Sequence, residues 1–226
     1  MPEPQPFLPK KGNYRNLIAY QKAECIYDIT FYFANHFLDP KDRTIDQMVQ
    51  AARSGKQNIA EGCAAGSTSS ETELKLNNVA KASLQELLVD YEDYLRVRGL
   101  EQWSLQDDRT KRTQSFCNTH NASTDYLSMI ESKSPSAETI ANIAITLIHQ
   151  EDVVLRKFIE RLEKDFQEQG GIKERMTAAR LGFRQSQKEE IERLIAENNQ
   201  LKDTVSRNET RIKYLENLLR SHNITY

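Results

Sequence analysis

Residues 45–62 are the segment that most restricts how this chain folds. Met48, Ala52 and Ile59 recur at helical spacing and form one apolar stripe. Small residues beside the stripe allow a neighbouring backbone to come close; they are Ala51, Ser54, Gly55 and Ala60. The pattern therefore predicts a helix that packs tightly against its neighbours.

The ends of this helix carry their own signals. Thr44 is placed to bond the amide of Gln47, whose side chain can reach back, as in a capping box. Gly62 and Gly66 are candidate left-handed stops. Asn58 lies near the end, and we expect it to hydrogen-bond the backbone or a neighbouring helix.

The same periodicity predicts three more long helices, at residues 13–37, 70–99 and 134–169. The third helix is expected to open with a capping box at Ser70, and the fourth with Ser134 as its cap. Short loops make successive helices antiparallel. The predicted fold class is all-α, an antiparallel up-and-down four-helix bundle followed by a long C-terminal coiled-coil helix.

The predicted division of the chain is a proline-rich extended lead at 1–12, the bundle at 13–169 and a basic linker helix with a coiled coil at 170–226. The connection 99–134 is much longer than the usual two to eight residues between bundle helices. We expect one or two short helices there, folded back on the bundle. Trp103 is interpreted as a packing anchor, with a ligand-stacking or base-stacking role as the alternative.

A heptad pattern follows Ile191 over four heptads, which predicts a coiled coil. Position a holds Ile191, Asn198, Val205, Ile212 and Leu219, and position d holds Leu194, Leu201, Asn208 and Leu215. Isoleucine at a with leucine at d favours two parallel strands, and core asparagines select register. Ile195 and Leu218 widen the apolar face and suit more strands, so the number of strands stays open.

Charge limits the nature of the partners. The chain holds 31 Lys+Arg against 33 Asp+Glu, a net charge of −2, so no global positive field attracts phosphate. Any nucleic-acid surface is therefore a local patch. The candidate residues are Lys10, Lys11 and Arg15, then Arg109, Lys111 and Arg112, then Lys173, Arg180, Arg184 and Lys188. The last group is alternatively a solvated face beside an apolar strip.

Catalytic and metal-binding motifs are not found in the sequence. There is no glycine-rich phosphate loop, no His-Glu-x-x-His and no Gly-x-Ser-x-Gly, and the four histidines stand at no ligand spacing. The three cysteines are far apart, which argues against a disulfide framework. The expectation is a non-enzymatic cytoplasmic protein without metal, cofactor, signal peptide or membrane span.

Residues 45–62 resemble the four-helix-bundle proteins encoded by intervening sequences of bacterial large-subunit ribosomal RNA genes. The accessory variability protein of diversity-generating retroelements belongs to the same group. The matching residues of this helix are Asp46, Gln47, Ala51, Ser54, Asn58, Ile59, Ala60, Glu61 and Gly62. The next helix adds Leu76, Ala80, Ser83, Leu84 and Glu86. The resemblance covers 13–98 well and 136–169 loosely.

The resemblance implies a non-enzymatic homo-oligomer, with a pentamer favoured. In the retroelement case, the pentamer partners a reverse transcriptase and is basic enough to bind nucleic acid. Wide apolar faces on the first and fourth helices point to a closed ring as well. Two functions therefore stay open: a nucleic-acid-binding accessory protein, for RNA or DNA, or an oligomeric scaffold that recruits a protein partner through its coiled coil.

Overall fold

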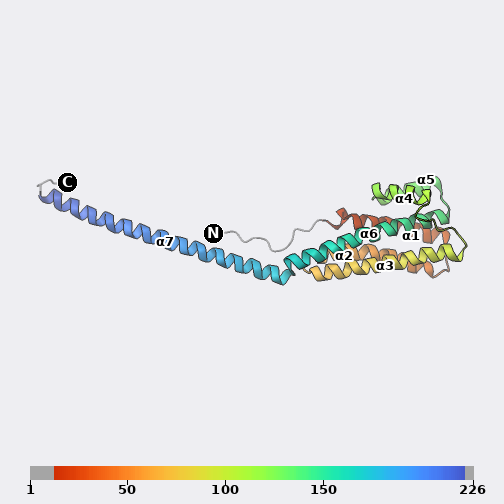
Figure 1. Ribbon diagram of the computed structural model, residues 1–226, viewed down its shortest axis with the longest axis horizontal. Helices are drawn as coiled ribbons and strands as arrows, with labels where there is room; N and C mark the ends of the chain where they lie inside the picture. The colour runs from red at the N-terminus through yellow and green to blue at the C-terminus, as the bar shows by residue number, and fades with distance from the viewer. Residues whose placement is uncertain (1–12, 222–226) are drawn as a thin grey trace. The chain divides into compact units, whose positions relative to one another are not determined.

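The computed structural model describes residues 13–221, and within them all regular secondary structure is helical (Figure 1). This confirms the all-α class. The predicted lead at 1–12, with Lys10 and Lys11, lies outside the described residues. A short 3-10 turn at Tyr14–Asn16 precedes the α-helices, which are α1 (Ile18–Phe37), α2 (Thr44–Ala65), α3 (Ser70–Val97), α4 (Asp108–Thr119), α5 (Ser123–Lys133), α6 (Ala137–Gln169) and α7 (Ile172–Ser221).

Four long helices form the bundle. α1 packs on α2, α2 on α3, α3 on α6 and α6 on α1, so each has two neighbours, and Figure 1 shows them side by side. α3 and α6 are antiparallel, as two hydrogen bonds between these parts of the chain show. Near the end of α3, Asn142 Nδ2 donates to Glu101 O at 2.8 Å, and a few turns earlier Gln85 Nε2 donates to Asp152 Oδ1 at 3.3 Å.

The long connection folds back on the bundle as two short helices, as the sequence predicts. α4 packs on α6 and α5 packs on α1. Gln150 Nε2 on α6 donates to Gln114 O on α4 at 3.0 Å, and the Ser123 hydroxyl at the start of α5 donates to the Asp28 carboxylate on α1. The outer apolar faces of α1 and α6 are thereby covered within the chain.

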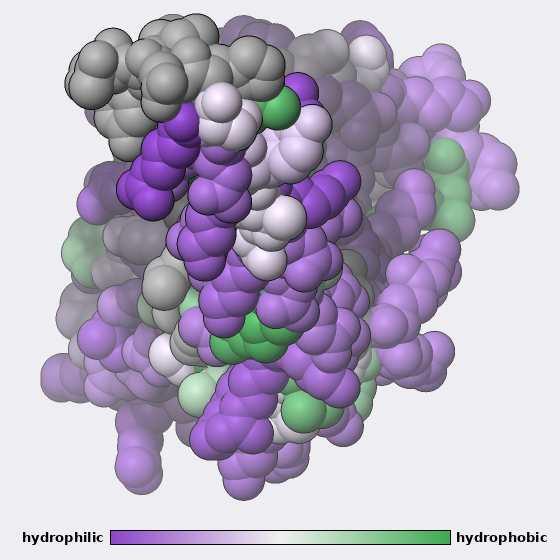
Figure 2. Space-filling model, turned by 90° about the vertical axis from the view of Figure 1, so that its left-hand side faces the viewer, coloured by the Kyte–Doolittle hydropathy of each residue, from purple (hydrophilic) through white to green (hydrophobic). Residues whose placement is uncertain are grey.

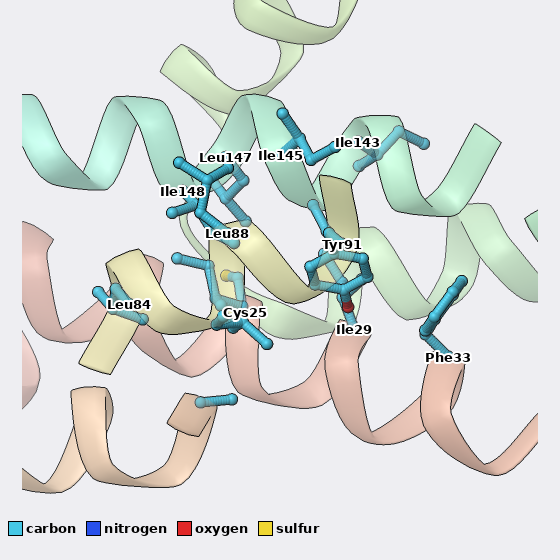
Figure 3. Packing of buried hydrophobic residues seen from close by; sticks show 14 of the residues in the cluster. Cys25, Ile29, Phe33, Leu84, Leu88, Tyr91, Ile143, Ile145, Leu147 and Ile148 are labelled. Atoms are coloured by element: carbon cyan, nitrogen blue, oxygen red, sulfur yellow. The ribbon is translucent and has the colours of Figure 1, made fainter. Parts of the chain in front are cut away.

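The core lies where α1, α3 and α6 meet (Figure 3). The rings of Phe33 and Tyr91 have centroids 5.1 Å apart, and both side chains are fully buried. Tyr91 keeps its hydroxyl satisfied by donating to Thr30 Oγ1 at 3.0 Å, and burial raises the pKa of that phenol. Each such buried large apolar side chain stabilises the fold by about 1.5–3 kcal/mol.

α2 and α3 approach closely because α2 carries glycines on the facing side. A Cβ added at Gly55 would lie 2.7 Å from Leu84 Cδ2, and one at Gly62 would lie 2.9 Å from Asn77 Nδ2. Ser54 and Ser83 share a hydrogen bond of 2.9 Å across the same contact. The expected close approach at Gly55 is therefore confirmed.

Asn58 hydrogen-bonds the backbone, as expected, since its Nδ2 donates to Ser54 O on the previous turn at 2.8 Å. Gly66 does end α2 as its C-cap, but the predicted left-handed conformation is wrong, because Gly66 has a right-handed φ of −63°. Gly62 lies inside α2, where it serves close packing and no left-handed turn. Among the described glycines, positive φ occurs instead at Gly99 and Gly170, which follow the ends of α3 and α6.

The predicted helix caps are displaced in the structure. Thr44 is the first helical residue of α2 and makes no capping box, because its amide donates to Asp42 Oδ1 at 2.9 Å. Ser69, one residue before the predicted cap, accepts from the Thr72 amide at 3.1 Å. The local sequence allows either Ser69 or Ser70 to be the N-cap. The path of the chain before the helix decides which of the two has the extended backbone that an N-cap needs.

The cap of α6 shifts in the same way. Ser136 is the N-cap and accepts from the Thr139 amide at 3.2 Å. Ser134, the predicted cap, instead ends α5 with a left-handed φ of 43°. Pro135 therefore lies in the junction between α5 and α6 and is no first residue of a helix. α5 ends at Lys133 and α6 begins at Ala137, so the proline lies in the short segment that separates them.

Candidate interaction surfaces

The chain divides between Lys173 and Glu174 into two units, the bundle and the rest of α7. α7 is one continuous α-helix of 50 residues, and none of its described residues is buried. The predicted continuous helix through the heptads is therefore present up to Ser221. Each unit presents its own candidate surface.

The heptad seam of α7 is exposed from Ile191 to Leu215, and Leu219 is half-buried. The exposed fractions are 57% for Ile191, 60% for Leu201, 55% for Val205 and 53% for Ile212. Figure 2, which views the side where α7 ends, shows a mostly hydrophilic surface with separate hydrophobic patches. A shallow groove beside Leu201 and Val205 accompanies the seam. Burial of such side chains would stabilise an assembly by about 1 kcal/mol or more each, so this seam is a candidate association surface.

The basic cluster of the long connection is balanced by its own neighbours. Arg109 binds Asp107 at 2.6 Å and Glu101 at 2.8 Å, and its hydrogen bonds hold the pKa of Asp107 below the ordinary range. The same guanidinium lies 5.0 Å above the Trp103 ring. The backbone amide of Trp103 donates to Asn142 Oδ1 at 2.8 Å, which ties the connection to α6.

The other two members of this cluster also have local partners. Lys111 Nζ lies 3.4 Å from Asp108 Oδ1, and Arg112 Nε donates to Asp108 O at 3.2 Å. Arg109 and Lys111 thus pair with the carboxylates of Glu101, Asp107 and Asp108, whereas the Arg112 bond is to a backbone carbonyl. A phosphate would have to compete with these acids, which makes the cluster a weak anion site.

The remaining candidate cations belong to different parts of the chain. Arg15 lies 5.6 Å above the Tyr14 ring at the start of the bundle. On α7, Lys173 is exposed and Lys188 lies 3.9 Å from Glu192. Arg180 and Arg184 are exposed and form no ion pair within the described residues. This pair on α7 is therefore the predicted basic site that local acids leave most accessible to an anion.

A buried polar group in the bundle has no counterpart among the sequence predictions. Lys22 on α1 is 4% exposed, and its ammonium donates to Cys117 O at 2.7 Å and to Gln150 Oε1 at 3.4 Å. Glu151 on α6 is fully buried, and neither of its carboxyl oxygens has a hydrogen-bond partner within the described residues. Burial raises the pKa of Glu151 well above its ordinary value, although the nearby Lys22 charge opposes the rise.

The signal for this group is present in the sequence pattern. Glu151 lies one helical turn from Leu147 and Leu155, on the apolar stripe of α6, where a charged residue is out of place. The thiols of Cys25 and Cys117 lie in the same region, and burial raises the pKa of Cys25 to about 12. These cysteines are therefore unreactive thiols of the core.

Residues 13–221 hold no candidate metal site, since no group of three or more His, Cys, Asp or Glu side chains in that range could hold a metal ion. Among the described helices, none combines the length and apolar character that a membrane span requires.

Comparisons with known proteins give no match. Neither a protein-family model, nor a curated protein, nor a solved structure is similar to this chain at a significant level. The resemblance to the ribosomal intervening-sequence proteins accordingly stays a prediction from the residues of α2 and α3. Fold and surface together define a helical-bundle protein that carries an exposed heptad helix.

Proposed function

We propose that this protein is a non-enzymatic, self-associating scaffold, in which α7 joins copies of the chain and the bundle binds a partner. The observation that carries the proposal is the apolar heptad seam of α7, which is exposed from Ile191 to Leu215. A helix with so much unburied apolar surface gains stability when a second helix covers it. Association is thus the activity that the geometry supports best.

Association through the bundle itself has less support. The wide apolar faces of α1 and α6, which favoured a ring, are covered by α5 and α4 of the same chain. Large apolar side chains still exposed on these two helices are Ile18, Phe31, Val153 and Phe166. The proposal of a homopentameric ring therefore rests on the family resemblance alone. The same is true of the proposal that a reverse transcriptase is the partner.

The scaffold proposal predicts that a change in the seam abolishes association. Replacing Leu201 and Ile212 together by lysine is expected to reduce the mass from light scattering to that of the unassociated bundle, because each change buries a charge in the seam. Thermal unfolding of the bundle should stay unchanged. A matched control replaces Leu181 and Tyr214, equally exposed residues of α7 outside positions a and d, by lysine and should keep the wild-type mass.

Two results would contradict this scaffold. One is a wild-type protein that stays monomeric at every concentration. The other is a Leu201 and Ile212 variant that keeps both the mass and the concentration dependence of the wild type.

Nucleic-acid binding is the second candidate function, and the exposed Arg180 and Arg184 favour it. Changing both to glutamate is expected to weaken the retention of RNA or DNA in filter binding. The logarithmic salt slope should fall by about one for each phosphate that the variant no longer binds. The same reversal at Lys75 and Lys111 is the control, since each of these exposed cations already pairs with an acid. No retention by the wild type at low salt rejects this function.

A further inference from the structure

The charges that flank the α7 seam are arranged for a partner helix. Glu197 and Arg211 occupy position g, whereas Lys202 and Glu216 occupy position e. Farther toward the start of α7, charged residues pair within the helix, as Glu190 does with Arg193 at 2.8 Å. Glu197, Lys202 and Glu216, by contrast, form no ion pair within the described part of the chain. They are available to a second strand.

We infer that α7 pairs with α7 of a second copy as a parallel, in-register, two-stranded coiled coil. The inference rests on the proposed self-association and specifies its partner, orientation and register. In this arrangement a g residue faces the e residue of the following heptad on the other strand. Glu197 then meets the partner's Lys202, and Arg211 meets the partner's Glu216. By symmetry each contact occurs twice, and the described heptads bring no like charges together.

The antiparallel alternative is less favourable. Its best register places Asn198 opposite the partner's Asn208. The two strands then cross symmetrically at residue 203, which lies level with the same residue of the partner. In antiparallel strands e faces e and g faces g. Glu197 then still meets the partner's Arg211 and Lys188 meets the partner's Glu216, but Lys202 lies beside the partner's Lys202. The charges thus favour the parallel orientation, in which opposite charges meet at every charged e–g contact.

The core positions favour the same arrangement. Ile191, Val205 and Ile212 are β-branched residues at position a, and leucine dominates position d, a combination that favours two parallel strands. Asn198 and Asn208 fix the register, because each amide meets its own copy only when the strands are aligned. A shift by one heptad places Asn198 against valine or isoleucine and leaves both amides unpaired in the seam.

A parallel pair has a functional consequence. The bundle precedes α7 in each chain, so both bundles are attached at the same end of the coiled coil. The dimer therefore presents two copies of any binding surface of the bundle to one partner. Binding of the second copy is intramolecular and strengthens the complex without a new contact.

Cysteine cross-linking in the full-length protein tests the orientation. Leu219→Cys places a thiol at position a, where it faces its own copy only in a parallel, aligned pair. Gln187→Cys faces the partner's residue 219 only in the antiparallel register. We expect Leu219→Cys to form a disulfide-linked dimer under a glutathione redox buffer. A mixture of Leu219→Cys with a mass-tagged Gln187→Cys chain should give no mixed dimer. The wild type is the control, because Cys25, Cys63 and Cys117 are buried.

The possible outcomes separate this inference from the proposed function. A mixed dimer without the Leu219→Cys dimer overturns the parallel orientation while association stands. Under reducing conditions, we expect the light-scattering mass of the wild type to be twice that of the Leu201 and Ile212 lysine variant. A mass three times that of the variant overturns the two-stranded state. Equal masses of these two proteins contradict the scaffold function itself.

Discussion

Replacing Glu151 by glutamine is expected to remove a pH-dependent loss of stability from the bundle. Burial raises the pKa of this carboxyl in the folded state, so between the ordinary and the raised pKa the folded protein holds a proton that the unfolded chain releases. The stabilisation present at low pH is therefore lost as pH rises through this window. The loss is about 1.4 kcal/mol per pH unit. Glutamine has the shape of the protonated carboxyl and does not ionise.

The measurement is urea unfolding of the wild type and the variant from pH 5 to pH 8. The stability difference between them should grow with pH inside the window, at about 1.4 kcal/mol per unit. Glu163→Gln, on an exposed site of the same helix, is the control and should show no such growth. A difference that stays constant over this pH range would show that Glu151 does not titrate with a raised pKa.

Replacing Gly55 by valine is expected to destabilise the bundle by about 3 kcal/mol. The added Cβ would lie 2.7 Å from Leu84 Cδ2 and 2.8 Å from Leu84 Cγ, and Leu84 is buried. Helix α2 would have to move away from α3, which loosens the packing along both helices. The free energy of unfolding from denaturant titration measures the effect.

A double-mutant cycle assigns this cost to the named contact. In a Leu84→Ala background, the Gly55→Val change should cost much less, because the colliding atoms are gone. Gly182→Ala provides the matched comparison, since a Cβ at Gly182 meets nothing within 4 Å. That change should increase the helicity of α7, in line with a gain of about 0.5–1 kcal/mol. Equal costs of Gly55→Val in both backgrounds would locate the strain elsewhere.

Helix positions were readable from the sequence because they depend on local pattern. The spacing of Met48, Ala52 and Ile59 predicts a helix over 45–62, and α2 (Thr44–Ala65) contains that segment. The caps were less predictable. Ser69 and Ser136, rather than the predicted serines, cap α3 and α6, since the backbone conformation before a helix depends on how the chain enters it.

The basic candidates show a different limit. Sequence spacing placed Arg109, Lys111 and Arg112 in one cluster, and the structure keeps them together on α4. Spacing did not reveal that Glu101, Asp107 and Asp108 pair with Arg109 and Lys111, because two of these contacts join the helix to the loop before it. A cation count therefore overstates what this surface offers to phosphate.

The sequence by itself determined the all-α class, the tight α2 segment and the heptad seam of α7, because periodicity, glycine spacing and heptads are local properties of the chain. Tertiary structure alone decided which apolar and charged groups are already used. α4 and α5 cover the faces of α6 and α1, and Lys22 and Glu151 come together in the core. These outcomes depend on contacts between residues far apart in the chain, which no local pattern contains.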